Sequence, residues 1–348
     1  MLLADHTTLR LGGPARRSVV AKTDEELVSA VRDADARGEP VLVLGGGSNL
    51  VVSDAGFEGV VVAVRSRGVQ RVESGAEVTL DVAAGEDCDA FVSRAVEDGL
   101  SGVEALSGIP GLVGATPMQN VGAYGQEVKD TIVLVRLWDR RAREAVTFDA
   151  VACAFRYRES RLKDEAGRYL VLGVSFRLAR SMQSAPIAYA ELARALGVKE
   201  GERAPLDRVR ETVVALRRGK GMVLDAADPD SRSAGSFFMN PIVSDADLPA
   251  LDARVRARLG DAVQVPRFPA SAGKTKLPAA WLIERAGFAK GHGAGRVGIS
   301  GKHTLALVNR GGGTTAELLA LAREVQAGVA SAFGVTLVPE PVLVGCSL

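Results

Sequence analysis

The segment Pro40-Val-Leu-Val-Leu-Gly-Gly-Gly-Ser-Asn49 joins a short apolar run to a glycine-rich loop, and a second apolar run begins at Leu50. A short apolar run ended by glycine is typical of a buried strand, so the loop is predicted to connect one strand to another. Successive small residues let consecutive backbone N–H groups point into one concavity, which suits a pyrophosphate, and Ser48 and Asn49 add side-chain donors. A tight glycine turn between strands has the same signature, and the local sequence leaves both interpretations open.

The loop is not the dinucleotide-binding fingerprint G-x-G-x-x-G, because Leu50 stands where the third glycine is needed and no helix follows. A closer match is Gly311-Gly-Gly-Thr-Thr-Ala316, which follows an apolar run and precedes a helical pattern. It lies near the C-terminus without βαβ units after it, whereas such a site normally opens its domain. We therefore interpret it as a strand-to-helix turn in which Thr314 and Glu317 form a capping box.

Short strands and helices alternate on both sides of the glycine loop. Thr23 and Glu26 form a capping-box pattern before a helix, and β-branched residues over 60–64 and 78–83 predict a sheet with one exposed face. Further strands are predicted over 131–138, 144–148, 169–178, 236–241, 304–309 and 335–344, and helices over 87–98, 189–196, 206–218, 245–259, 279–286 and 315–332. A polar break over 179–186 is a candidate hinge, and a domain boundary is predicted near residue 225.

Residues 107–125 contain five glycines and two prolines in nineteen positions, a density that no regular element tolerates. Such a segment is either an ordered functional loop or a flexible linker. Its apolar residues, among them Ile109, Leu112 and Met118, favour burial, since linkers are polar. We therefore predict an ordered loop with a functional role.

The overall composition is that of an ordinary globular protein. The chain has 348 residues, 43 Lys and Arg against 42 Asp and Glu, and 47% hydrophobic residues, which favours two or three domains and excludes disorder. A net charge of +1 offers no electrostatic footprint for nucleic acid or an anionic membrane. The longest apolar runs are far shorter than the roughly 20 residues that span a bilayer, and the N-terminus has no signal pattern. We expect a cytoplasmic protein.

Cysteine and histidine are too scarce to suggest a disulfide framework or a metal centre. The three cysteines are widely separated, and only three histidines accompany them: Cys88, Cys153, Cys346, His6, His292 and His303. We expect no metal. The 39 glycines are unusually many and indicate backbone positions with positive φ or close approach to a bulky group.

Polar residues that could act chemically recur in three short clusters. Tyr157-Arg158 follows an apolar stretch, Ser236 lies within Ser233-Ala-Gly-Ser-Phe-Phe-Met-Asn-Pro241, and Glu340 stands between two prolines in an apolar terminal segment. An isolated carboxylate in such a segment is costly to bury unless it is paired, so Glu340 is either an exposed edge residue or a functional group.

Taken in order, these motifs resemble the UDP-N-acetylenolpyruvoylglucosamine reductase family, also called UDP-N-acetylmuramate dehydrogenases. The resemblance spans roughly residues 6–345. The length and Tyr189 are similar to the larger subclass, in which a mobile loop presents a tyrosine to the substrate. The motifs that carry the resemblance are Gly45-Gly-Gly-Ser-Asn49, the loop over 109–125, Phe155-x-Tyr157-Arg158-x-Ser160, Ala234-Gly-Ser-Phe-Phe-x-Asn-Pro241 and Pro339-Glu340.

The resemblance implies an α+β protein with the FAD-binding fold of the vanillyl-alcohol oxidase type and a C-terminal α+β substrate domain. Two subdomains would hold FAD, one formed by residues 1–65 with the tail 341–348 and the other by residues 66–224. Residues 225–340 would cover the substrate. The implied reaction uses NADPH to reduce the flavin. The enolpyruvyl ether of UDP-N-acetylglucosamine then takes the hydride and becomes UDP-N-acetylmuramate, a peptidoglycan precursor.

The resemblance also implies roles for individual residues. Arg158 would neutralise the substrate carboxylate as negative charge develops, Glu340 would assist as a protonated acid, and Ser236 would supply the proton. The residues matched to substrate-binding positions are Tyr189, Lys220, Asn240 and His303. The residues matched to FAD contacts are Gly45, Gly46, Gly47, Ser48 and Asn49 for the pyrophosphate, and Gly114, Thr116, Gln119, Asn120, Ala123 and Gly125 for the ring and ribityl side. The 45–49 loop holds no His or Cys, so non-covalent FAD is expected.

Two other functions remain as alternatives. A flavin oxidase of the vanillyl-alcohol type would act on an alcohol or sugar, but hydride abstraction from an alcohol needs a base and not a proton donor such as Ser236. A non-catalytic nucleotide-sugar binding protein would have no use for Arg158, Ser236 and Glu340 together. No obligatory protein partner is evident.

Overall fold

A computed structural model describes all residues from 1 to 348. The chain forms two compact units: a central unit of residues 15–46 and 58–218, and a terminal unit of residues 1–14, 47–57 and 219–348. No helix is both long and apolar enough to cross a membrane. The finer division of the chain at residues 65 and 224 stays a prediction.

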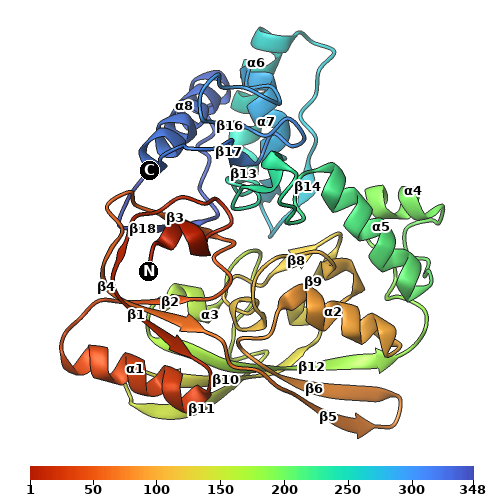
Figure 1. Cartoon of the computed structure of the whole chain (residues 1–348). Helices are drawn as coiled ribbons and strands as arrows, with labels where there is room; N and C mark the ends of the chain where they lie inside the picture. Colours follow the sequence, from red (N-terminus) through yellow and green to blue (C-terminus); the bar gives the residue numbers. More distant parts are fainter. The chain divides into compact units, whose positions relative to one another are not determined.

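The central unit is built on two sheets (Figure 1). The larger is antiparallel, with β11 (Glu144–Asp149), β10 (Ile132–Asp139), β12 (Tyr169–Arg180), β6 (Glu77–Ala83) and β5 (Val69–Ser74) in that order, and β7 (Leu100–Ser101) pairs with the end of β12. The smaller holds β1 (Ala15–Ala21), β4 (Phe57–Val64) and β2 (Val41–Leu44), with β2 parallel to β4. β2 therefore delivers the chain directly into the glycine loop.

Two capped helices cover these sheets. α1 (Asp24–Ala36) begins at Thr23, whose hydroxyl accepts a hydrogen bond from the Glu26 backbone at 3.1 Å, and α1 contacts β1 and β2. α2 (Cys88–Glu97) begins at Asp87, whose carboxylate accepts from the Ala90 backbone at 2.9 Å. Such side-chain caps satisfy N–H groups that lack partners in the first turn, and the predicted starts of both helices are confirmed.

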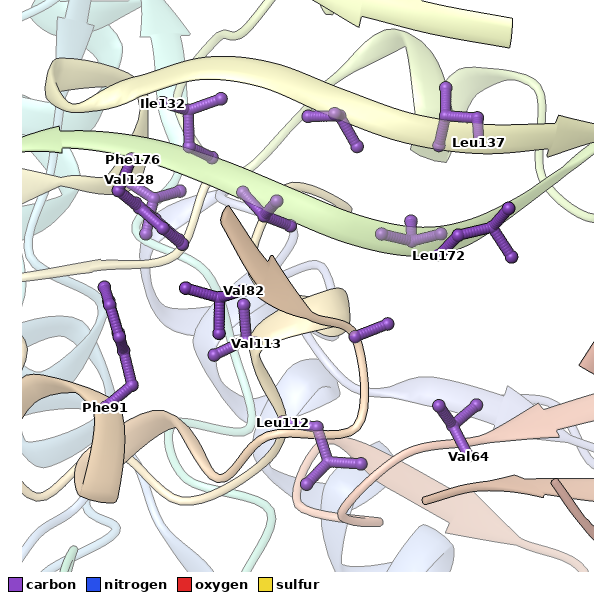
Figure 2. Close-up of a cluster of buried hydrophobic side chains, with 14 of the residues drawn as sticks. Val64, Val82, Phe91, Leu112, Val113, Val128, Ile132, Leu137, Leu172 and Phe176 are labelled. Carbon is purple, nitrogen blue, oxygen red and sulfur yellow. The ribbon is translucent and has the colours of Figure 1, made fainter. Parts of the chain in front are cut away.

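The 107–125 loop packs its apolar residues against the sheet, as predicted: Leu112 and Val113 are buried, and Ile109, Met118 and Val121 are partly buried. Figure 2 shows Leu112 and Val113 in one cluster with Val82, Phe91 and Phe176. The rings of Phe91 on α2 and Phe176 on β12 are 4.7 Å apart, so the helix packs on the face of the sheet. Because each buried apolar side chain of this size contributes about 1.5–3 kcal/mol, this cluster holds the loop against the sheet.

The rest of the central unit consists of short elements that surround the loop. They are η2 (Glu104–Leu106), η3 (Val113–Ala115), η4 (Val128–Asp130), the hairpin of β8 (Gly122–Ala123) and β9 (Gln126–Glu127), α3 (Arg161–Asp164), α4 (Ala190–Leu196) and α5 (Leu206–Gly219). A second apolar cluster joins α4 and α5 through Leu192, Val209 and Val213. This cluster anchors the segment that carries Tyr189.

The terminal unit packs three helices around short strands. α8 (Thr315–Phe333) contacts α6 (Leu248–Leu259), α7 (Ala279–Ala286) and the hairpin of β16 (Val297–Ile299) and β17 (Leu307–Asn309). The other elements are η1 (Leu3–His6), η5 (Pro229–Ser231), η6 (Asp245–Asp247), the sheet β13–β15–β14 (Ile242–Ser244, Lys274–Lys276, Phe268–Pro269) and the parallel pair of β3 (Leu50–Val52) and β18 (Val342–Val344). Thr314 and Glu317 form the predicted capping box of α8, so the glycines at 311–313 belong to a helix start.

Two predicted strands of this unit are much shorter than expected. The strand predicted over 335–344 is reduced to β18, and the one predicted over 236–241 forms only an isolated bridge from Phe238 to Pro339. Pro339 and Pro341 have no backbone N–H and cannot continue a ladder. The two segments lie side by side, but they do not form a regular sheet.

Candidate functional site

The first half of the glycine loop lies in the central unit and leaves backbone donors available. Gly45 and Gly46 donate no backbone hydrogen bond within this unit, and Gly46 is exposed. A Cβ on Gly46 would lie 2.6 Å from the Cα of Gly111, so two loops touch backbone to backbone there. The packing thus excludes a side chain at Gly46, beside two consecutive backbone N–H groups that can bind a phosphate oxygen.

The second half of the loop lies in the terminal unit. Gly47 has φ +65°, and a Cβ there would lie 1.9 Å from the carbonyl oxygen of His6. Any other residue at 47 would therefore meet both a disfavoured conformation and a backbone clash. The Gly47 carbonyl accepts a hydrogen bond from the Thr8 backbone at 3.2 Å, which fixes the direction in which the chain continues to Ser48 and Asn49.

Asn49 connects the loop to the segment of Glu340. Its side-chain Nδ2 donates to the carbonyl of Glu340 at 3.4 Å, and its own carbonyl accepts from the Val342 backbone at 2.9 Å. The second bond extends the parallel pairing of β3 with β18. The second half of the glycine loop and Glu340, far apart in sequence, are therefore neighbours within the terminal unit.

Ser236 lies beside the same segment. The Glu340 backbone N–H donates to the carbonyl of Phe237 at 2.9 Å, and the Phe237 N–H donates to Leu305 at 2.7 Å. The rings of Phe237 and Phe238 are buried and 5.1 Å apart, which anchors the chain directly after Ser236. Gly235, with φ +73°, forms the turn before it. Ser236 and Glu340 thus occupy adjacent positions on two paired segments.

Gly114 and Thr116 shape the flavin-side loop in the central unit. A Cβ on Gly114 would lie 2.5 Å from the Cβ of Ala84, and the Gly114 N–H donates to the Ala84 carbonyl at 2.9 Å. Thr116 is buried, and its hydroxyl donates to the Val113 carbonyl at 2.8 Å. Both residues therefore set the path of the loop against the sheet.

Gly114→Ala is expected to destabilise the protein by about 1–3 kcal/mol, the usual cost of an added methyl group in a packed site. It should weaken FAD binding as well, because the loop can accommodate the methyl only by moving away from Ala84. Thermal unfolding and FAD titration measure the two effects. Gly219→Ala, which has open space and an unstrained backbone, is the matched control and should behave as the unmodified protein. Equal stability of the two variants would contradict this account of the loop.

Asn120 is fully buried, and its side chain is engaged within the protein. Nδ2 donates to Glu127 Oε2 at 2.9 Å and to the Arg156 carbonyl at 3.1 Å, while Oδ1 accepts from the Lys129 backbone at 3.2 Å. Its φ of +46° suits asparagine better than most residues. Any contact of Asn120 with a flavin would therefore use its backbone. Gln119 and Ala123 are half-buried and Gly125 is exposed.

Arg158 stands at the tip of a tight turn beside this loop. Its φ is +57°, and its guanidinium Nη2 donates to the Gly122 carbonyl at 2.9 Å. The guanidinium carbon lies 5.5 Å from the centre of the Tyr157 ring. The loop predicted to contact the flavin and the arginine predicted to contact the substrate are thus joined directly.

Tyr189 contacts the 109–125 loop through the ring of Tyr124. Tyr189 is 45% exposed, and its ring meets that of Tyr124 edge-on at a centroid distance of 5.5 Å. Burial raises the pKa of Tyr124 to about 12, so its hydroxyl is neutral at physiological pH. A Cβ on Gly125 would lie 3.0 Å from the Cβ of Ala188, so this glycine allows the segment before Tyr189 to approach closely.

The remaining predicted substrate residues lie in the terminal unit. Oδ1 of Asn240 accepts from the Ala279 backbone at 2.9 Å, at the start of α7. Lys220 follows directly after α5. His303 lies in a turn in which its backbone donates to the Ser300 hydroxyl at 3.2 Å and accepts from Ala306 at 3.0 Å. Each of the three residues has a defined place within the terminal unit.

The structure thus gathers the predicted residues into two groups, one in each unit. Sequence reasoning missed three residues that shape the central group: Gly111, Tyr124 and Ser160. All three lie inside the quoted motifs, and Gly111 and Tyr124 belong to the glycine-dense loop that marked the region as functional. The residues that the resemblance assigns to FAD fit that cofactor, because free backbone donors and side-chain-free packing lie at the glycine loop.

Two family models match the chain. The model of the FAD binding domain matches residues 15–146, and the model of the UDP-N-acetylenolpyruvoylglucosamine reductase C-terminal domain matches residues 228–344. The expected α+β fold with an FAD-binding domain and a C-terminal domain of the reductase family is confirmed.

Whole-length relatives agree with these models. UDP-N-acetylenolpyruvoylglucosamine reductases of Thermobifida fusca and Streptomyces coelicolor are each 57% identical over 347 residues, which is 99% of this chain and 97% and 90% of theirs. The crystal structure of UDP-N-acetylenolpyruvylglucosamine reductase from Thermus caldophilus is 26% identical, with a TM-score of 0.65 over 99% of this chain and 97% of that one. The chain belongs to the UDP-N-acetylenolpyruvoylglucosamine reductase family of FAD-dependent oxidoreductases.

Proposed function

We propose that the chain reduces UDP-N-acetylglucosamine enolpyruvate to UDP-N-acetylmuramate with NADPH, as a step of peptidoglycan precursor synthesis, and that Arg158, Ser236 and Glu340 carry the chemistry. The observation that supports these roles best is the pairing of the Ser236 and Glu340 segments, with the Glu340 N–H donating to Phe237 at 2.9 Å. This pairing sets Phe237 opposite Glu340, so the backbone of Ser236 lies one residue away from the position opposite Glu340, and both residues can be proposed to act on one small substrate.

The glycine loop and the 114–125 loop would hold FAD, which would supply the hydride chemistry: it would take a hydride from NADPH and deliver it to the terminal carbon of the enolpyruvyl group. Negative charge then develops at the adjacent carbon and spreads to the carboxylate. The guanidinium of Arg158 is permanently cationic and stabilises this charge. Glu340, as a protonated acid, donates a hydrogen bond to the same carboxylate. The Oγ of Ser236 gives its proton to the adjacent carbon, so the double bond gains one hydride and one proton.

The cofactor and substrate contacts complete the proposal. Gly45 and Gly46 would offer backbone N–H groups to the pyrophosphate, and the half-buried or exposed residues Gln119, Ala123 and Gly125 would hold the side of the flavin ring. Tyr189, Lys220, Asn240 and His303 are the proposed contacts with the nucleotide sugar. The substrate is a small molecule, and the proposal needs no protein partner.

The proposed compartment is the cytoplasm. All three cysteines are free thiols, as is usual in a reducing compartment. Burial raises the pKa of Cys88 and of Cys153 to about 12, so neither forms a reactive thiolate at neutral pH. The redox chemistry is therefore left to the flavin.

The purified protein is expected to be yellow, to release FAD into the supernatant after acid precipitation, and to lose its visible flavin absorbance when NADPH is added without oxygen. Absorbance spectra of the protein and the supernatant provide the measurement. A colourless protein that binds no added FAD, or flavin that stays attached to the precipitate, would contradict the proposal of a non-covalent flavoenzyme.

A further inference from the structure

The turn that presents Arg158 has an unfavourable backbone conformation. Arg156 and Glu159 exchange backbone hydrogen bonds of 2.9 and 3.2 Å, so Tyr157 and Arg158 form the tip of a tight turn. The φ of +57° at Arg158 lies in the left-handed region, where residues other than glycine and asparagine pay about 1 kcal/mol or more. Such a conformation persists only when the surroundings hold it in place.

Ser160 provides one such hold. It is fully buried, and its Oγ donates to the Met118 carbonyl of the flavin-side loop at 2.6 Å. The same oxygen accepts from the Lys163 backbone at 3.3 Å and thereby caps α3. The ammonium group of Lys163 in turn donates to the Arg158 carbonyl at 3.0 Å. A single buried hydroxyl thus joins the loop, the helix start and the residue that supports the turn.

Two further bonds join the turn to the same loop. Asn120 donates to the Arg156 carbonyl at 3.1 Å, and the guanidinium of Arg158 donates to the Gly122 carbonyl at 2.9 Å. The turn is therefore bound to the loop before, at and after Arg158. Of these three bonds, only that of Ser160 can be removed without changing Arg158 itself or a residue predicted to contact FAD.

We propose that Ser160 is a positioning residue for the reduction of the substrate: its bond to Met118 fixes where the turn holds the Arg158 guanidinium relative to the flavin-side loop. The inference rests on the proposed role of Arg158 toward the substrate carboxylate. Ser160 itself touches neither cofactor nor substrate in this account, because its side chain is fully buried within the central unit.

Ser160→Ala is expected to slow the reoxidation of the NADPH-reduced flavoenzyme by the enolpyruvyl substrate about 10- to 100-fold, since a misplacement of about 1 Å can cost this much. Reduction of the flavin by NADPH should stay within about twofold, because that step does not use Arg158. Stopped-flow absorbance follows both steps separately. In steady state, the loss should appear mainly in kcat.

A double-variant comparison separates positioning from a general structural effect. If Ser160 acts through Arg158, then Ser160→Ala should slow reduction of the substrate by less than about twofold in a protein that already carries Arg158→Met.

Ser175→Ala is the matched control, because Ser175 is also buried, also in the central unit and bonded to Asp81 at 3.2 Å. It should lower thermal stability without favouring either step. If Ser160→Ala fails to fold, Lys163→Met replaces it in the test. This variant removes the bond to the Arg158 carbonyl without leaving a buried cavity, and it should cause a smaller but still selective loss in the rate of substrate reduction.

The outcomes separate the role of Ser160 from the role of Arg158. A selective loss in Ser160→Ala and Lys163→Met that disappears in the Arg158→Met background supports the inference. If Arg158→Met slows substrate reduction but neither Ser160→Ala nor Lys163→Met does, or if the losses multiply, the positioning role is wrong and the role of Arg158 stands. If Arg158→Met itself has no effect, the proposed role of Arg158 fails first.

Discussion

In the Ser236→Ala variant, we expect NADPH to reduce the flavin at the normal rate. Reoxidation of the flavin by the enolpyruvyl substrate should be slower by about 100- to 10,000-fold. The hydroxyl of Ser236 is the proposed source of the proton that completes the reaction. Without this hydroxyl, the carbanion formed by hydride transfer is not protonated, so the hydride can return to the flavin and the product does not form. Stopped-flow measurement of the two half-reactions separates the intact step from the lost one.

Ser236→Cys and Ser244→Ala serve as controls for this prediction. A thiol can still donate a proton, so Ser236→Cys should recover part of the loss. Ser244 lies in the same unit but is exposed and only caps a short 3-10 helix, so Ser244→Ala should behave as the unmodified protein. Unchanged steady-state turnover in Ser236→Ala would rule out its role as proton donor.

Arg158→Met should slow reduction of the substrate by about 100- to 1,000-fold, the usual cost of removing one group that stabilises developing negative charge. Arg158→Lys keeps the charge but not the planar guanidinium, so an intermediate loss is expected. The flavin content and the rate of reduction by NADPH should change little. Single-turnover reoxidation at saturating substrate gives the rate constants.

Arg156→Met is the matched control for Arg158, because both arginines lie in the same turn. The Arg156 guanidinium is exposed and pairs with Glu159 at 3.1 Å and Asp164 at 2.7 Å. Exposed ion pairs of this kind contribute about 0–1 kcal/mol, so this variant should keep both half-reactions. Equal losses in the two variants would assign the effect to the turn as a whole and contradict a specific role for Arg158.

Local sequence signals predicted the helix starts and the order of the glycine-dense loop. Thr23 and Thr314 accept backbone hydrogen bonds from Glu26 and Glu317 as their spacing predicted, because a cap depends on residues within one turn. The order of the 107–125 loop could be predicted because its apolar residues favour burial over a polar linker. The limits of strand β5 were not predicted within the sheet expected between residues 60 and 84, since its residues are all exposed and its pattern does not alternate.

The parts of the site that depend on distant pairing could not be read from the sequence. Nothing near Asn49 indicates that its side chain meets the Glu340 carbonyl, or that Phe237 accepts from the Glu340 N–H. The buried amide of Asn120 is another case, because its partners at Arg156 and Glu127 belong to other segments. The family resemblance supplied these residues as a set, and the structure supplies the bonds that hold them.

The reoxidation of NADPH-reduced enzyme tests the central claim most directly. The reduced protein is prepared without oxygen and mixed either with UDP-N-acetylglucosamine enolpyruvate or with air-saturated buffer, and the return of flavin absorbance is followed. The account predicts that the enolpyruvyl substrate reoxidises the flavin much faster than air and is converted to UDP-N-acetylmuramate in equal amount. Rapid reoxidation by air together with no reaction with the enolpyruvyl substrate would identify an oxidase and contradict the account.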